Sequence, residues 1–100
     1  MELLDTCADT AFPARTASYT GSAGSTATWP AGPQGVLVWS TSDAYIAVGE
    51  GVTATTASTP LPANTPVPLT VPLTVSGAWR VSAIQISASG TLYAKPMNIR

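Results

Sequence analysis

Apolar and polar residues alternate between Pro66 and Ser76, where the chain reads PVPLTVPLTVS. Five apolar residues have odd numbers, so they share one face of an extended strand: Val67, Leu69, Val71, Leu73 and Val75. Pro66, Pro68 and Pro72 remove N–H donors from one side only, because residues i and i+2 of a strand point their N–H groups the same way. The pattern therefore predicts an edge strand that pairs on one side and resists pairing on the other.

From Gly35 onward, apolar runs recur about every ten residues between turn signals, a spacing typical of a sandwich or barrel. The continuous run Val36–Trp39 predicts a central strand covered on both faces, with Trp39 in the core. Thr41–Asp43 has turn chemistry, and Gly49-Glu50-Gly51 predicts a tight turn or bulge with positive φ. These features favour an all-β fold.

The middle and end of the chain give less uniform signals. Residues 52–57 fit either a polar strand or an irregular loop, whereas the prolines of residues 58–66 predict a loop with polyproline character. Trp79 is expected in the core, and the apolar face of residues 78–87 changes midway, which predicts a bulge near Ala83 or burial on both faces. Residues 87–90 are expected to close a hairpin into a last strand over 91–95, and helix content should be minimal.

Residues 1–34 differ from the rest because large apolar residues are sparse there. A short strand over Arg15–Thr20 fits the local pattern, and the turn-rich stretch 29–35 follows. The whole segment is expected to be an extended N-terminal arm lying on its own domain or on a neighbouring subunit, with a flexible tail as the alternative. The predicted architecture is thus an arm over 1–34 and a small antiparallel β-sandwich or jelly-roll-like barrel over 35–100.

Composition suggests a surface that is covered by something. Hydrophobic residues make up 45% of the 100-residue chain but charged residues only 9%, well below the roughly 25% of an average globular protein. Oligomerisation or docking onto a larger assembly would explain the shortage of charge, and a monomer with a Thr-rich surface is the alternative. The net charge of −1, with four scattered cationic residues, argues against nucleic-acid binding.

The sequence offers little catalytic or metal-binding chemistry. Histidine is absent, which removes the commonest general base and metal ligand. Asp43 and Glu50 flank one candidate strand and should lie at its opposite ends, too far apart for a paired-carboxylate mechanism. Cys7 has no partner for a disulfide or zinc site. No enzyme activity, cofactor, metal or small-molecule ligand is expected, nor is a membrane span or a secretory signal.

Aromatic and apolar residues are therefore the remaining candidates for a binding role. The contacts expected with a partner come from the arm and from the edge strand, and they are Phe12, Tyr19, Trp29, Val67 and Leu69. The tryptophans and tyrosines also allow a sugar-binding face, because aromatic rings stack on the apolar faces of sugars.

The stretch from about Gly35 to Met97 resembles a group of small virion proteins of tailed bacteriophages. Three segments carry the resemblance: VLVWSTSDAYIAVGEGVTAT, LPANTPVP and WRVSAIQISASGTLYAKPM. It implies a jelly-roll-like capsid decoration or cement protein that binds the major capsid protein, self-associates, for example as a homotrimer, and resides on the capsid surface of the virion after synthesis in the host cytoplasm. A carbohydrate-binding or adhesion module of a phage tail or spike is the second expectation.

Overall fold

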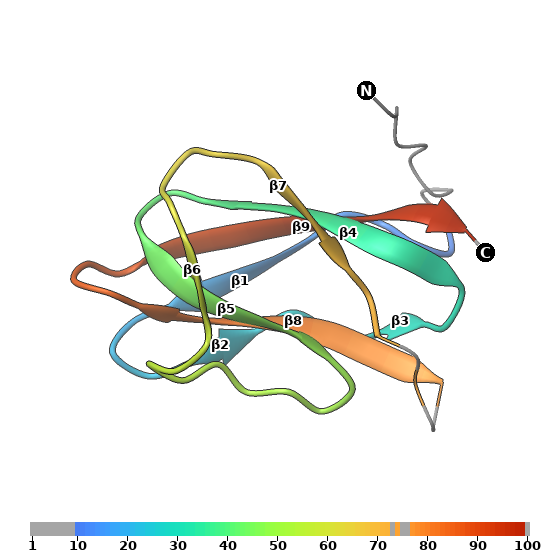
Figure 1. Ribbon diagram of the computed structural model, residues 1–100, viewed down its shortest axis with the longest axis horizontal. Coiled ribbons are helices and arrows are strands. Elements are labelled where there is room, and N and C mark those ends of the chain that lie inside the picture. Colours follow the sequence, from blue (N-terminus) through green and yellow to red (C-terminus); the bar gives the residue numbers. More distant parts are fainter. Residues whose placement is uncertain (1–9, 73, 75–76, 100) are drawn as a thin grey trace.

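The computed structural model describes residues 10–72, 74 and 77–99, and it shows two antiparallel β-sheets packed face to face (Figure 1). The strands are β1 (Arg15–Tyr19), β2 (Gly24–Ser25), β3 (Trp29–Pro30), β4 (Pro33–Ser40), β5 (Ala44–Gly49), β6 (Thr59–Leu61), β7 (Val67–Thr70), β8 (Ala78–Gln85) and β9 (Gly90–Ile99). None of the described residues is helical. The predicted small β-sandwich and the minimal helix content are thus confirmed. Cys7, Leu73, Val75 and Ser76 lie outside the described residues.

The two sheets have distinct strand orders. Sheet A runs β1-β9-β4-β7, and sheet B runs β2-β8-β5-β6, with β3 also paired to β8. β4 is therefore an inner strand of sheet A, as its continuous apolar run predicted. Consecutive strands often lie in different sheets, as β4 and β5 do, so the turns at 41–43 and 87–90 carry the chain from one sheet to the other. The predicted hairpin between residues 78–87 and 91–95 is wrong, because turn residues signal a reversal but not whether the next strand pairs locally.

The core lies between the sheets and consists of alternate side chains from both. It contains Ala17, Tyr19, Trp29, Val36, Val38, Ala44, Ile46, Leu61, Val71, Trp79, Val81, Ala83, Leu92 and Ala94. Trp79 is fully buried, as expected. Trp39, which was expected in the core, is instead only partly buried, because it has the opposite parity from the buried Val36 and Val38 and lies on the outer face of sheet A.

Residues 15–34 belong to the sandwich, which corrects the expectation of an arm extending to residue 34. β1 pairs with β9 along its whole length, and the predicted short strand is present. Tyr19 and Trp29 are each 1% exposed. The Tyr19 hydroxyl donates to the Ser42 carbonyl (2.7 Å), so the segment is tied to the turn between β4 and β5. The segment joins the sandwich although it has few large apolar residues, because both of these aromatic side chains are buried in the core.

The edge-strand prediction is confirmed for β7, Val67–Thr70, whereas Val71 and Pro72, which the alternating pattern also included, form no strand. β7 pairs only with β4, and Val67 and Leu69 are more buried than Pro68 and Thr70. Pro68 lies opposite Leu37, which must be a non-hydrogen-bonded pair because proline has no N–H to donate. The absent donor therefore points outward, away from β4. β6, at the edge of sheet B, also contains a proline, Pro60.

The proline-containing segment 58–66 differs from its prediction in one respect. Thr59–Leu61 forms β6 rather than loop, because Pro60 lies opposite Tyr45 at the sheet edge, where a missing donor is tolerated. Residues 52–57, left open between strand and loop, form no strand. Gly49 and Gly51 have φ values of 151° and 64°, which confirms the predicted turn with positive φ.

β8 is covered on both faces, which explains its change of apolar parity. Trp79, Val81 and Ala83 face the core, while Ser82 on the opposite face is also buried. The Ser82 hydroxyl accepts a hydrogen bond from the Ala54 backbone N–H (2.9 Å), so the loop after β5 covers the outer face of sheet B here. The register between β5 and β8 is continuous from residue 80 to residue 85. Burial on both faces, rather than a bulge, is therefore the correct alternative.

Candidate docking surface

An aromatic pair lies on the outer face of sheet A. Trp39 on β4 is directly opposite Tyr93 on β9, and their rings stack with centroids 4.5 Å apart and planes at 12°. Both side chains point away from the core because they alternate with the buried Val38, Leu92 and Ala94. Tyr93 is 37% exposed, one of the two most exposed large apolar side chains of the described residues. The stacking fixes both rings on the surface.

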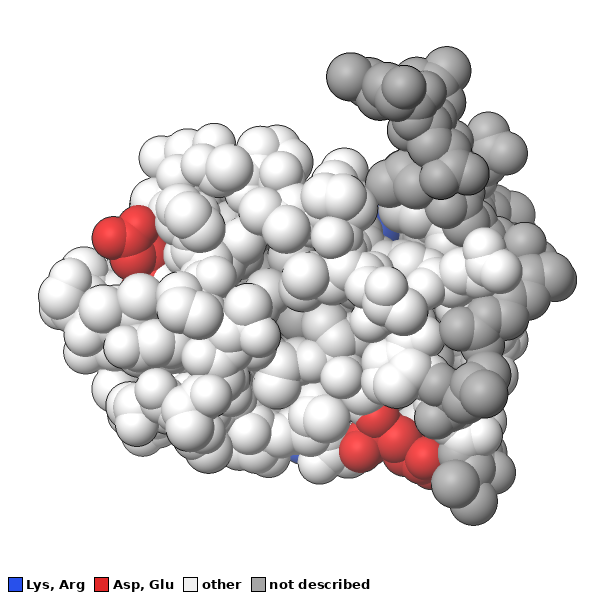
Figure 2. Space-filling model, in the orientation of Figure 1, with Lys and Arg blue, Asp and Glu red and all other residues white. Residues whose placement is uncertain are grey.

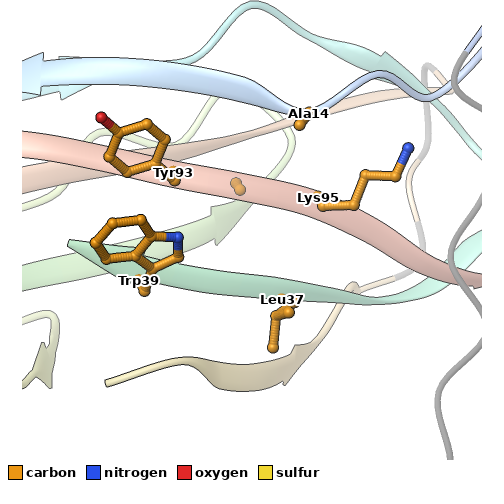
Figure 3. Close-up of a pocket in the computed structure, with 6 residues that line it drawn as sticks. Ala14, Leu37, Trp39, Tyr93 and Lys95 are labelled. Atoms are coloured by element: carbon orange, nitrogen blue, oxygen red, sulfur yellow. The ribbon is translucent and has the colours of Figure 1, made fainter. Parts of the chain in front are cut away.

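The aromatic pair forms one end of a shallow groove of about 190 Å³ (Figure 3). The groove is lined by Ala14, Leu37, Trp39, Tyr93, Ala94 and Lys95. Leu37 comes from the same strand as Trp39, and Lys95 from the same strand as Tyr93. In Figure 3 the Lys95 amine points away from the two rings. It donates to the Phe12 carbonyl (2.9 Å), so the single charged group of the groove is bound to the chain preceding β1.

The register extends this surface across the sheet. Pro68 on β7 lies opposite Leu37, and Thr16 on β1 lies opposite Tyr93, so both belong to the outer face. We call the set Leu37, Trp39, Pro68 and Tyr93 the aromatic platform. It consists of apolar side chains from three neighbouring strands of sheet A. Such a composition, rich in aromatic residues and poor in charge, is typical of the centre of a protein interface.

The five residues expected to contact a partner lie elsewhere. Tyr19 and Trp29 are in the core, and Phe12, Val67 and Leu69 are partly buried and pack against it. Sequence reasoning missed the aromatic platform because Trp39 and Tyr93 lie far apart in sequence and pair only through the β4–β9 register. The signal that could have found them is parity: Trp39 and Leu37 alternate with the two valines, as Tyr93 alternates with Leu92 and Ala94.

A face with few charges is visible on another side of the molecule. In the view of Figure 2, which looks onto the side where β6 and β7 lie, acidic side chains occur only near the margins of the face and the rest is almost entirely uncharged.

A second hollow of about 200 Å³ is lined by Asp43, Pro60, Leu61, Pro62 and Ile86. Ile86 is 43% exposed there. The Asp43 carboxylate accepts a hydrogen bond from the Ala63 N–H (2.8 Å), which gives it a structural role in this loop.

The structure does not bring Asp43 and Glu50 together. They flank the six-residue strand β5, so seven residue steps, or about 23 Å of extended chain at about 3.3 Å per residue, separate them. Among the described residues, no group of three or more His, Cys, Asp or Glu side chains is placed to hold a metal ion. The part of the chain that is described also contains no helix long and apolar enough to span a bilayer.

Comparisons with protein-family models, curated proteins and solved structures found no match to this chain.

Proposed function

We propose that this protein is a structural component of a bacteriophage particle, of the capsid decoration or cement type, which binds the major capsid protein through the outer face of sheet A. The motifs described above motivate the assignment to a virion. The observation that carries the docking role is the stacked pair of Trp39 and Tyr93 on a surface with a single charged neighbour. A partner that covers these rings would remove apolar surface from water at about 25 cal/mol per Å².

The outer face of sheet A is too small for tight binding by a single copy, which argues that several associated copies bind the shell together. Four strands about 4.8 Å apart and a β4 of eight residues give an outer face of roughly 19 by 26 Å, or about 500 Å². A stable protein interface usually buries about 800 Å² on each partner. One copy bound by sheet A alone would therefore be weakly held. Self-association around a symmetry axis of the shell, as a homotrimer for example, would add contacts and avidity.

Quantitative mass spectrometry of purified particles tests this assignment. A decoration protein is expected at a copy number that is a fixed multiple or fraction of the major capsid protein, and it should remain with heads separated from tails. Absence from the heads, or a copy number of only a few per particle, would contradict the proposal.

A carbohydrate-binding module of a tail or spike is the second candidate. The observation in its favour is that the exposed Tyr93 ring has the Thr16 hydroxyl side chain directly opposite on β1, so an aromatic surface and a polar group lie together. The mutual stacking of Trp39 and Tyr93 counts against it, because each ring already uses one face on the other. Binding on a glycan array that is lost in Trp39→Ala would favour this candidate over the first.

A further inference from the structure

The hollow beside β6 combines one carboxylate with apolar walls. Its volume is about 200 Å³, and it is lined by Asp43, Pro60, Leu61, Pro62 and Ile86. We call it the Asp43 hollow. Ile86 is 43% exposed, the most exposed large apolar side chain of the described residues. An exposed apolar wall next to a carboxylate matches a ligand that is itself partly apolar and partly charged.

The Asp43 carboxylate is held in place and is still exposed. Its Oδ1 atom accepts a hydrogen bond from the Ala63 N–H (2.8 Å), and the Asp43 backbone carbonyl accepts one from the Ile86 N–H (3.2 Å). Asp43 as a whole is nonetheless exposed. An ionised carboxylate has about four acceptor positions, so the bond from Ala63 uses only part of its capacity. The carboxylate is therefore positioned before a ligand arrives, which reduces the entropy lost on binding.

The backbone of β6 presents acceptors rather than donors at this edge. Pro60 and Pro62 have no N–H. Pro60 lies opposite Tyr45 in a pair that must be non-hydrogen-bonded, so its carbonyl points away from β5. Leu61 pairs with Ala44 in the alternate, hydrogen-bonded position, so its N–H faces β5. A carboxylate and an outward carbonyl oxygen thus meet a ligand here, and both favour a donor with positive charge.

We propose that the Asp43 hollow binds a lysine side chain of the capsid protein, with the ammonium at the Asp43 carboxylate and the methylene stem against Ile86 and the prolines. This inference rests on the proposed function, since it names a second contact with the same partner. Lysine fits because its long stem packs on apolar surface while its ammonium keeps polar contacts. Arginine fits less well, because its fork binds both oxygens of a carboxylate at once and Oδ1 is already bonded to Ala63.

The lysine comes from another protein rather than from a second copy of this chain. Lys95 is the only lysine in the sequence, and its Nζ already donates to the Phe12 carbonyl (2.9 Å). A second copy would have to break that bond before its lysine could enter the hollow. Trp39 of the aromatic platform is four residues from Asp43, at most about 14 Å along the chain. The hollow therefore adds a contact close to a face that is small for an interface.

NMR of the full chain tests the site with n-butylammonium chloride, which has the stem and the charge of lysine. The backbone amide signals of Ala63 and Ile86 report on it, because both N–H groups donate to Asp43. Both signals are expected to shift saturably, and much less in sodium chloride of the same ionic strength or in n-butanol. Asp43→Asn keeps an oxygen for the Ala63 N–H and removes only the charge, so it should abolish the shifts.

Three results of the titration would overturn the proposal. They are the absence of a saturable shift, an equal shift in either control or in Asp43→Asn, and tighter binding of n-butylguanidinium than of n-butylammonium.

Binding to the particle separates this inference from the proposed function. Asp43→Asn is expected to weaken binding to particles lacking the protein by about tenfold, the effect of one charged hydrogen bond. Glu50→Gln, at the other end of β5, is the control of equal charge change. Thermal unfolding of both variants shows whether they are folded.

The outcomes distinguish the two proposals. Normal binding of a folded Asp43→Asn variant, together with tight binding of the wild type, overturns the inference and leaves the proposed function standing. Loss of self-association in Asp43→Asn, measured by sedimentation, would assign the hollow to a second copy and also overturn it. If the wild type itself does not bind, the proposed function fails, and the butylammonium titration still decides whether the hollow binds a lysine-like cation.

Discussion

Two aromatic pairs in this protein have similar ring distances but opposite relations to water. Trp29 and Trp79 lie 4.7 Å apart in the core, at 1% and 0% exposure, and their indole N–H groups donate to the carbonyls of Pro13 (2.8 Å) and Pro30 (3.0 Å). Trp39 and Tyr93 lie 4.5 Å apart on the outer face of sheet A. No described residue forms a hydrogen bond with either of those side chains.

The difference shows what each pair contributes. A buried tryptophan needs a partner for its N–H, because an unpaired buried donor costs about 1–3 kcal/mol. The core pair satisfies this requirement within the chain, so it serves folding. The surface pair keeps its polar atoms for solvent or for another molecule, so it can contribute to binding at little cost to stability.

Removing a tryptophan from each pair should give the largest contrast. Trp79→Ala is expected to lower the free energy of unfolding by about 3–5 kcal/mol, because it leaves a large cavity at a fully buried position. Trp39→Ala should cost only about 0.5–1.5 kcal/mol, the value of one cross-strand aromatic contact. Urea denaturation followed by circular dichroism measures both. Equal losses of unfolding free energy would contradict the conclusion that the core pair stabilises the fold and the surface pair does not.

A second variant tests the close approach of β1 and β2. A Cβ atom built on Gly24 would overlap the Ser18 carbonyl oxygen, so β2 can follow β1 this closely only with glycine there. Gly24→Ala is expected to destabilise the fold by about 1–3 kcal/mol through overpacking. Gly21→Ala is the control, because a Cβ atom at Gly21 would make only an ordinary contact with Gln85 Nε2 (3.8 Å). A Gly24→Ala variant as stable as the wild type would contradict the close approach of β1 and β2.

The hydrogen bonds of the indole groups provide a smaller contrast. Trp29→Phe removes the donor to Pro13 and leaves that partly buried carbonyl without its partner, which should cost about 1–2 kcal/mol in addition to the lost ring volume. Trp39→Phe keeps an aromatic ring beside Tyr93 and should change stability by less than about 0.5 kcal/mol. Thermal unfolding curves of the two variants at the same protein concentration compare them. A larger loss for Trp39→Phe would reverse the assignment of the two pairs.

The mildest test leaves stability unchanged and measures the access of water. Acrylamide should quench the fluorescence of the wild type mainly through Trp39, because Trp29 and Trp79 are enclosed. In Trp39→Phe the quenching constant is expected to fall severalfold. A constant equal to that of the wild type would mean that one of the core tryptophans is accessible.

The sequence predicted those features of the fold that depend on local covalent geometry. The prolines around β7 identified an edge strand, because the loss of an N–H is independent of the tertiary context. Gly49 and Gly51 identified a turn with positive φ for the same reason. Alternation correctly grouped Trp79 with Val81 and Ala83 on one buried face of β8.

The placement of the other two tryptophans could not be predicted in this way. Parity tells which side chains share a face but not which face is inside, and in Val36–Trp39 both parities are apolar. Trp39 was therefore assigned to the core, and Trp29, in its Pro- and Gly-rich surroundings, to a contact surface. Their actual places follow from the pairing of β3 with β8 and of β4 with β9, which are contacts between segments far apart in sequence. The docking surface depends on the same long-range register.

Binding of variants to capsids that lack the protein tests the central claim most directly. The double variant Trp39→Ala/Tyr93→Ala should bind at least about tenfold more weakly than the wild type while remaining folded, because it removes the centre of the aromatic platform. Tyr45→Ala, which alters an aromatic residue opposite Ile84 on the outer face of sheet B, should bind as the wild type does. Unchanged binding of the folded double variant would contradict docking through sheet A.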